Sequence, residues 1–196
     1  EEGGHTEGDD FTWIIDPLDG TTNFVHGFPQ FAISIAVKHK NELEVGVIYD
    51  PLRQEMFMAT KGEGARLNNR RIRVSETKTL EQSLIGTGFP FRDSQHLIPY
   101  MNTFQNLFPQ TAGVRRAGAA ALDLAYVAAG RFDGFWEAAL KEWDMAAGVL
   151  MIKEAGGFVS DFQGEENFLD NGNVIAGNPK IHKSLVDIIQ KSLEMA

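Results

Sequence analysis

The stretch WIIDPLDGTTN, residues 13–23, decides how this chain is interpreted. Residues 11–15 form a short β-prone run, which predicts a strand that ends in an acidic turn. Pro17 fixes its own φ angle and pushes the preceding residue toward an extended backbone. The turn can therefore aim the carboxylates of Asp16 and Asp19 at one point.

The carbonyl of Leu18 can reach the same point. Carboxylates and carbonyls are hard oxygen ligands that suit Mg²⁺ or Mn²⁺, and a bound cation relieves the repulsion between close carboxylates. Gly20, followed by Thr21 and Thr22, can open a helix whose free N–H groups face an anion. Magnesium bridging carboxylates to phosphate would explain this combination, whereas the acidic turn alone is equally consistent with an ordinary surface Asx turn.

Composition narrows the class of protein. The chain has 196 residues, of which 43% are apolar, enough for one compact domain or two small ones sharing a core. The absence of cysteine excludes disulfides, thiolate metal sites and a thiol nucleophile, and fits a cytoplasmic protein. The net charge of −9 argues against broad nucleic-acid binding, but not against a phosphorylated substrate, because bound cations invert the local sign. No apolar run approaches the ~20 residues that span a bilayer.

The order of apolar and polar residues along the chain predicts two halves. Residues 1–80 begin with a polar loop over 1–12 and continue as an antiparallel meander. Its further strands are expected at 31–37, 43–49 and 55–59. Residues 81–196 alternate strands with helices, which predicts an α/β half. The helices are expected at 96–108, 118–129, 144–155 and 179–193, and the strands at 83–88, 158–160 and 174–176.

The other acidic residues each allow a structural and a functional interpretation. Asp144 stands where a helical pattern begins, so it is either a plain N-cap or a carboxylate brought to the same metals, with Trp143 as a packing wall. Glu137 precedes it by seven positions and has the same two readings. Glu1 and Glu2 could complete a metal shell or accept a proton from water, although glutamates at a chain start are more often solvated.

The remaining polar residues carry weaker signals. No two histidines stand at metal-ligand spacing. Arg66, Arg70, Arg71 and Arg73 form a local basic cluster, which is usually a solvated face and less often a partner surface.

Longer motifs give a specific resemblance. WIIDPLDGTTNF at 13–24, and WDMAAG at 143–148 running on to EAGG at 154–157, resemble the two signatures of the inositol monophosphatase family. AAALDLAYVAAG at 119–130 and GTGFP at 86–90 resemble its bacterial branch. The similarity extends over the whole chain.

The resemblance implies a fold and an activity. The fold would be a layered αβαβα sandwich of mixed α+β and α/β character, here without the family's N-terminal helices. The activity would be lithium-sensitive hydrolysis of inositol monophosphate with two or three Mg²⁺ ions, or Mn²⁺, in a homodimer. Bisphosphate nucleotides or fructose bisphosphate are alternative substrates. A non-enzymatic role as a protein partner in transcription complexes is an alternative of another class, and an inactive metal-binding fold is a third.

The resemblance also implies roles for residues. The metal ligands would be Glu1, Asp16, Asp19, Asp144 and the Leu18 carbonyl. Thr21 with Glu1 would activate the attacking water, with Asp19 beside them, and the amides of Gly20 and Thr21 would hold phosphate. The substrate pocket would be lined by Asp19, Asp144, Glu137, Ala120 and the turn of Gly118 and Ala119. Ala119 departs from the Ser or Thr that other members often carry there, which would loosen a polyol contact.

Overall fold

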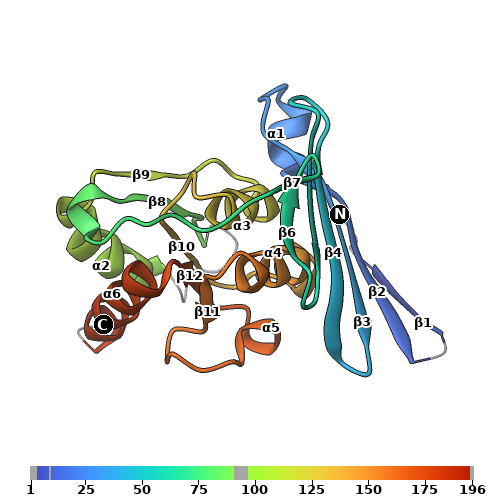
Figure 1. The fold of residues 1–196 in the computed structure, drawn as a ribbon. Helices are drawn as coiled ribbons and strands as arrows, with labels where there is room; N and C mark the ends of the chain where they lie inside the picture. The colour runs from blue at the N-terminus through green and yellow to red at the C-terminus, as the bar shows by residue number, and fades with distance from the viewer. Residues whose placement is uncertain (1–3, 9, 91–96, 195–196) are drawn as a thin grey trace.

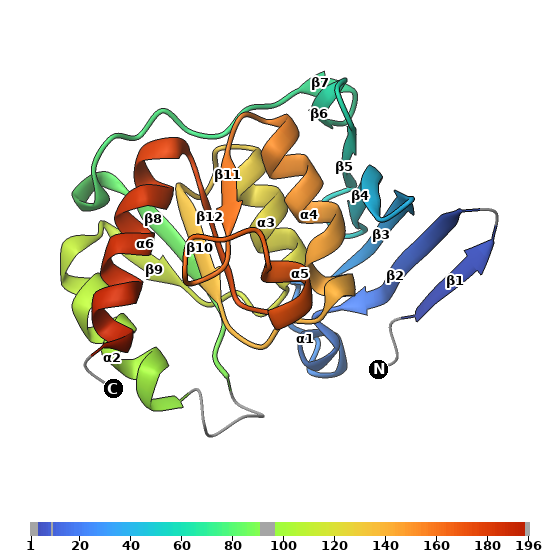
Figure 2. The ribbon, with the colours of Figure 1, turned by 90° about the horizontal axis from the view of Figure 1, so that it is seen from below.

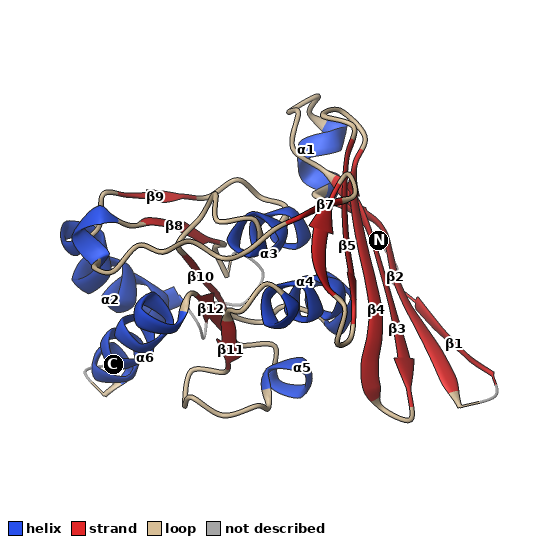
Figure 3. Cartoon of the chain, viewed as in Figure 1, coloured by secondary structure: helices blue, strands red, loops and turns tan. Residues whose placement is uncertain are grey.

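The computed structural model describes residues 4–8, 10–90 and 97–194 and arranges them in layers (Figure 1). A large sheet forms one side, a pair of helices packs on it, a smaller sheet follows, and two more helices cover the far side (Figure 3). This layered α+β arrangement confirms the predicted fold class.

The large sheet is an antiparallel meander in chain order, as predicted. Its strands are β1 Gly4–Gly8, β2 Phe11–Asp19, β3 Ala32–His39, β4 Glu42–Asp50, β5 Glu55–Thr60, β6 Gly64–Leu67 and β7 Arg70–Arg71. The predicted loop over residues 1–12 is wrong, because β1 pairs with β2 as a hairpin. An edge strand is held by backbone hydrogen bonds, so a polar, glycine-rich segment can form one without an apolar pattern.

The small sheet has the strand order β11-β12-β10-β8-β9. Its strands are β8 Leu84–Thr87, β9 Gly113–Arg115, β10 Gly134–Glu137, β11 Phe158–Ser160 and β12 Val174–Gly177. β8 runs parallel to both β9 and β10, while β12 runs antiparallel to β10 and β11. The carboxyl ends of β8 and β10 therefore meet at one edge, where Glu137 ends β10.

The helices largely follow the predicted ranges. They are α1 Thr21–Val25, α2 Leu97–Leu107, α3 Ala120–Ala128, α4 Glu142–Glu154, α5 Phe168–Asn171 and α6 Pro179–Leu193, with 3₁₀ turns at Leu80–Gln82 and Phe108–Gln110. Asn178 caps α6 by accepting from the backbone N–H groups of Lys180 and Ile181, and Pro179 opens the helix. Across the three described ranges, every helix is too short or too polar to cross a bilayer.

Alternation along the small-sheet strands builds two apolar cores. Phe135 and Ala176 face the layer of α3 and α4, whereas their neighbours Trp136 and Ile175 face α2 and α6. All four side chains are buried, as a sheet covered on both faces requires. The small sheet is thus the wall between the two cores.

Glycines set how closely the middle helices approach their neighbours. A Cβ on Gly148 of α4 would lie 2.5 Å from Leu124 Cβ of α3. A Cβ on Gly46 of β4 would lie 2.9 Å from the Ala147 carbonyl oxygen of α4. Neither position has room for a methyl group, so α4 sits against both β4 and α3 at backbone distance.

We predict that Gly148→Ala destabilises the protein by about 1–3 kcal/mol, because overpacking outweighs the gain in helix propensity. Urea unfolding followed by circular dichroism measures the change. The exposed Lys183→Ala on α6 serves as the control and should shift stability by less than about 0.5 kcal/mol. An unchanged or raised midpoint for Gly148→Ala would show that the two helices can move apart at little cost.

Candidate active site

The acidic motif lies within β2 and not in a turn. β2 continues through Asp16, Pro17, Leu18 and Asp19, and its pairing with β3 shifts register between Asp16 and Asp19. Pro17 has no N–H to give to a ladder, which suits a bulge. The predicted turn is therefore corrected to a bulged strand, and the bulge leaves both Asp16 and Asp19 buried on the same face.

The chain leaves this strand through Gly20. Its φ of 83° is in the left-handed region, and a Cβ there would lie 2.8 Å from the Gln30 carbonyl oxygen, so only glycine fits without strain. Thr21 then begins α1, and its hydroxyl donates to the Leu18 carbonyl at 2.8 Å. Thr21 and Leu18, both of which were predicted as site residues, are thus hydrogen-bonded to each other.

Asn23 of α1 ties this loop to the other half of the chain. Its Nδ2 lies 2.7 Å from the Gln30 carbonyl oxygen, 3.0 Å from that of Ala117 and 3.1 Å from that of Gly118. Gly118, with a φ of 86°, is the turn before α3. One amide side chain therefore fixes the acidic loop against the start of α3.

Asp144 is in the first turn of α4, but it is not the N-cap. Lys141 is the N-cap, and Asp144 is the third helical residue, whose Oδ2 accepts from the Lys141 N–H at 2.7 Å. The prediction of a plain cap is corrected, since the helix begins two residues earlier with Glu142. Lys38 of β3 forms an ion pair with Glu142 and joins this first turn to the large sheet.

Three carboxylates converge here. Asp16, Asp19 and Asp144 each offer an oxygen, and these oxygens lie within 4.8 Å of one another. Asp19 Oδ2 accepts from the Ala121 N–H at 2.9 Å, at the start of α3. Burial, then the charges of Asp144 and Asp16, raise the pKa of Asp19 well above its usual value. This hard-oxygen set, with its mutual repulsion, fits one or more Mg²⁺ ions.

A second acidic group adjoins the three carboxylates. Glu137 ends β10, and a Cβ on Gly88 would lie only 1.8 Å from Glu137 Oε1, so the carboxyl group occupies space that glycine leaves open. Burial and the charge of Asp144 raise the pKa of Glu137 to about 8, against the opposing influence of Arg116. The predicted pocket residue thus faces the same centre as Asp144.

The remaining predicted residues that the structure describes lie near this centre. Ala119 and Ala120, both buried, stand at the start of α3, next to the amide that Asp19 accepts from. Glu1 and its neighbour Glu2 lie outside the described residues. The assignment of individual roles to the site residues stays a prediction.

Sequence reasoning missed two residues. Asp123 of α3 is 1% exposed, and its Oδ1 has no hydrogen-bond partner within the described residues. Burial, then Glu137 and Asp19, raise its pKa, while Arg116 lowers it. The signal was a single acid within the otherwise apolar run ALDLAYVAA. Arg116, whose guanidinium lies 5.2 Å from the Phe89 ring centroid, is the cation beside both acids.

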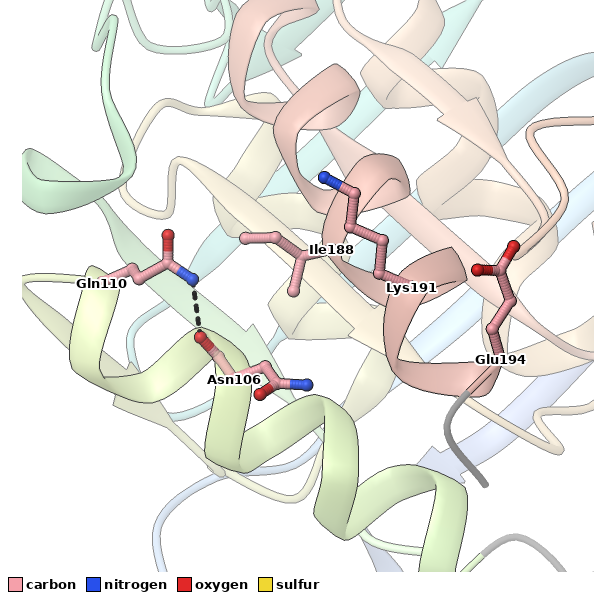
Figure 4. Close-up of a pocket in the computed structure, with 5 residues that line it drawn as sticks. All are labelled: Asn106, Gln110, Ile188, Lys191 and Glu194. Atoms are coloured by element: carbon pink, nitrogen blue, oxygen red, sulfur yellow. Dashed lines mark hydrogen bonds between the residues drawn. The ribbon is translucent and has the colours of Figure 1, made fainter.

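A cavity on the far side of the molecule is separate from this site. It lies between α2 and α6 and is lined by Asn106, Gln110, Ile188, Lys191 and Glu194 (Figure 4). The small sheet and the core beneath α2 and α6 stand between this cavity and the three carboxylates.

Comparison with known proteins identifies the family to which the chain belongs. The model of the inositol monophosphatase family matches residues 1–194. The chain belongs to the inositol monophosphatase family. It is 60% identical to the Nus factor SuhB of Pseudomonas aeruginosa, over 98% of this chain and 73% of that protein. It is 50% identical to the inositol-1-monophosphatase of Mesorhizobium japonicum, over 98% and 73%.

Solved inositol monophosphatase-family structures share the fold. The extragenic suppressor protein suhB of Bartonella henselae superposes with a TM-score of 0.90 at 49% identity, over 93% of this chain and 70% of that one. The relatives are thus longer than the matched region, and the three-carboxylate centre lies within the part that is shared.

We predict that Glu137 makes the metal-free protein less stable as pH rises. Its pKa is raised from 4.5 to about 8 on folding, so its contribution is fully present below pH 4.5 and is lost as pH rises through 8. Between these values the loss is up to about 1.4 kcal/mol per pH unit. Glu137→Gln should therefore flatten the decline between pH 6 and pH 8.5.

Urea unfolding in EDTA at several pH values measures this. Glu165→Gln, at an exposed glutamate, is the matched control and should keep the wild-type profile. Parallel profiles for wild type and Glu137→Gln would contradict the prediction.

Proposed function

We propose that the chain hydrolyses a small phosphate monoester with Mg²⁺, and that inositol monophosphate is the substrate. The observation that carries the proposal is the convergence of Asp16, Asp19 and Asp144 within 4.8 Å beside the first turns of α3 and α4. Membership of the inositol monophosphatase family and the name of the Mesorhizobium relative support this substrate class. A homodimer and a cytoplasmic location, which the resemblance and the composition suggested, stay predictions.

The proposal gives each of the candidate site residues a role. Asp16, Asp19 and Asp144 would hold the metal ions through their converging oxygens, with the Leu18 carbonyl as a further donor. Divalent ions bound there supply Lewis acidity, which lowers the pKa of a bound water and offsets negative charge on phosphoryl oxygens. Glu137 and the backbone around Gly118 would face the hydroxyl groups of the substrate.

In this proposal Thr21 orients the attacking water. Its hydroxyl proton is donated to the Leu18 carbonyl, so its lone pairs remain free to accept a hydrogen from a water molecule. A water that donates a hydrogen to Thr21 would keep an oxygen lone pair available for attack on phosphorus. Glu1, the other predicted water-activating residue, lies outside the described residues.

The metal ligands are tested by removing one negative charge at a time. Asp16→Asn and Asp144→Asn should each lower Mg²⁺-dependent phosphate release from inositol 1-phosphate by more than about 100-fold, since even the partners of metal ligands are worth about 10- to 100-fold. Asp187→Asn, at an exposed aspartate of α6, is the control and should keep full activity. Circular dichroism checks that the variants fold.

Near-normal turnover in Asp16→Asn and Asp144→Asn would contradict the proposal. The same assay with Li⁺ should show inhibition. A panel including a bisphosphate nucleotide and fructose bisphosphate decides between inositol monophosphate and the alternative substrates.

The water-orienting role of Thr21 has its own test. Thr21→Val should lower kcat by about 10²-fold or more with little change in KM, because it removes an acceptor that acts on the attacking water. Thr21→Ser should retain most of the activity. Thr22→Val, at the exposed neighbour in α1, is the matched control. Equal activity for Thr21→Val and Thr22→Val would remove Thr21 from the mechanism.

We also propose a role as a protein partner in transcription complexes, because the Pseudomonas relative at 60% identity is named a Nus factor. Such a role should survive loss of catalysis. Co-purification of Asp16→Asn with transcription complexes at the wild-type level supports it, and failure of the wild-type chain to co-purify argues against it.

A further inference from the structure

The edge of the large sheet farthest from β1 carries a dense positive charge. Four arginines lie on β6, on β7 and just after β7: Arg66, Arg70, Arg71 and Arg73. We call this group the arginine hairpin. All four side chains are exposed, in a chain whose net charge is −9. Within the described ranges, no carboxylate forms an ion pair with any of them.

The strand register places like charges opposite one another. Arg66 pairs directly with Arg71 across β6 and β7, and Leu67 pairs with Arg70. Like charges directly opposite destabilise a sheet. An anion between the two guanidinium groups would relieve this repulsion.

The backbone beneath these side chains is firmly held. Glu154, at the end of α4, accepts from the N–H groups of Gly62 and Gly64 at 2.8 Å each, which fixes the start of β6. Asn68, in the turn between the strands, accepts from the Met56 N–H at 2.9 Å and donates to the Gln54 carbonyl at 3.1 Å. The backbone of the hairpin is therefore anchored to α4 and to the turn before β5.

Gly64 also gives Arg71 its place. A Cβ on Gly64 would lie 2.8 Å from Arg71 Nη2, so the guanidinium group rests against the glycine backbone. After β7, the Val74 N–H donates to the Ala155 carbonyl, which keeps Arg73 close to the carboxyl end of α4. That end of a helix is the negative end of its dipole and favours cations.

We propose that the arginine hairpin binds the phosphate backbone of single-stranded nucleic acid. Successive strand residues point to opposite faces, so Arg70 points away from the face that Arg66 and Arg71 share. The charge forms a ridge and not a flat patch, and a flexible polyanion can wrap a ridge whereas a flat surface touches one side. The guanidinium fork also bonds phosphate through two N–H groups and stacks on bases, which lysine does not do.

The hairpin is remote from the carboxylate centre. The two lie at opposite ends of α4, with Asp144 in its first turn and Glu154 in its last. Figure 2 shows β6 and β7 at the top of the molecule and α1 at the bottom. Binding at the hairpin therefore does not need the metal site, and the proposal is independent of the proposed phosphatase activity.

Salt dependence provides the decisive measurement. Fluorescence anisotropy of a labelled oligouridylate of about 12 nucleotides is measured with the chain between about 50 and 200 mM salt. Four phosphate contacts predict a slope of log K against log [salt] of about −3, since each contact contributes about −0.7 on single strands. In Arg66→Gln/Arg71→Gln the slope should fall to about −1.4, with weaker binding at every salt concentration.

The control removes the same charge elsewhere. Lys180→Gln/Lys183→Gln, at exposed positions of α6, should bind like wild type. Phosphate release should be unchanged in the arginine variant, and circular dichroism confirms its fold. An oligothymidylate arm shows whether the ribose hydroxyl adds to a shared backbone contact.

Three results would overturn the proposal. They are no binding at about 50 mM salt, equal losses in the arginine and lysine variants, and an unstructured polyglutamate peptide that competes as well as the oligonucleotide. The last result would assign the hairpin to an acidic protein segment instead.

Discussion

The mutual repulsion of three carboxylates is the constraint around which this fold is organised. Each of them accepts a hydrogen bond from a backbone N–H. Asp16 accepts from Leu18, Asp19 from Ala121 and Asp144 from Lys141. These bonds orient the three carboxylates, and one oxygen of each lies within 4.8 Å of the others. Two of the donors belong to the starts of α3 and α4, where helix dipoles favour negative charge. Backbone hydrogen bonds thus offset part of the repulsion within this cluster.

Such a centre depends on the whole core, because its ligands come from both ends of the chain. Asp16 and Asp19 belong to the large sheet, while Asp144 belongs to the helix packed on it. The separation between them is set by the contact of Gly46 with Ala147 and of Gly148 with Leu124. An added methyl group at either glycine acts on the ligand distances as well as on stability. Core packing and the geometry of the three carboxylates are therefore coupled in this protein.

The sequence predicted the elements well where periodicity is strong, and its two long motifs contain the three carboxylates that converge. The meander, α6 and the layered fold follow from apolar patterning and from the resemblance to the family. The bulge at Pro17 did not follow, because register shifts depend on the partner strand. The sequence pattern left Asp144 open between a cap and a metal-site carboxylate, because an apolar pattern does not show where the first polar turn begins. Asp123 was missed because its proximity to Glu137 is purely tertiary. β1 was missed because backbone pairing leaves no mark on side-chain composition.

The length of α4 explains how one small chain can present surfaces of opposite sign. At a rise of about 1.5 Å per residue, Asp144 and Glu154 are about 15 Å apart along the helix. Asp16 and Asp19 are buried near the first turn of α4, whereas the four arginines are exposed near its last turn. The positive end of the helix dipole faces the carboxylates, and the negative end faces the arginine hairpin. A single helix therefore favours both charge clusters through its dipole and keeps the three carboxylates apart from the arginine hairpin.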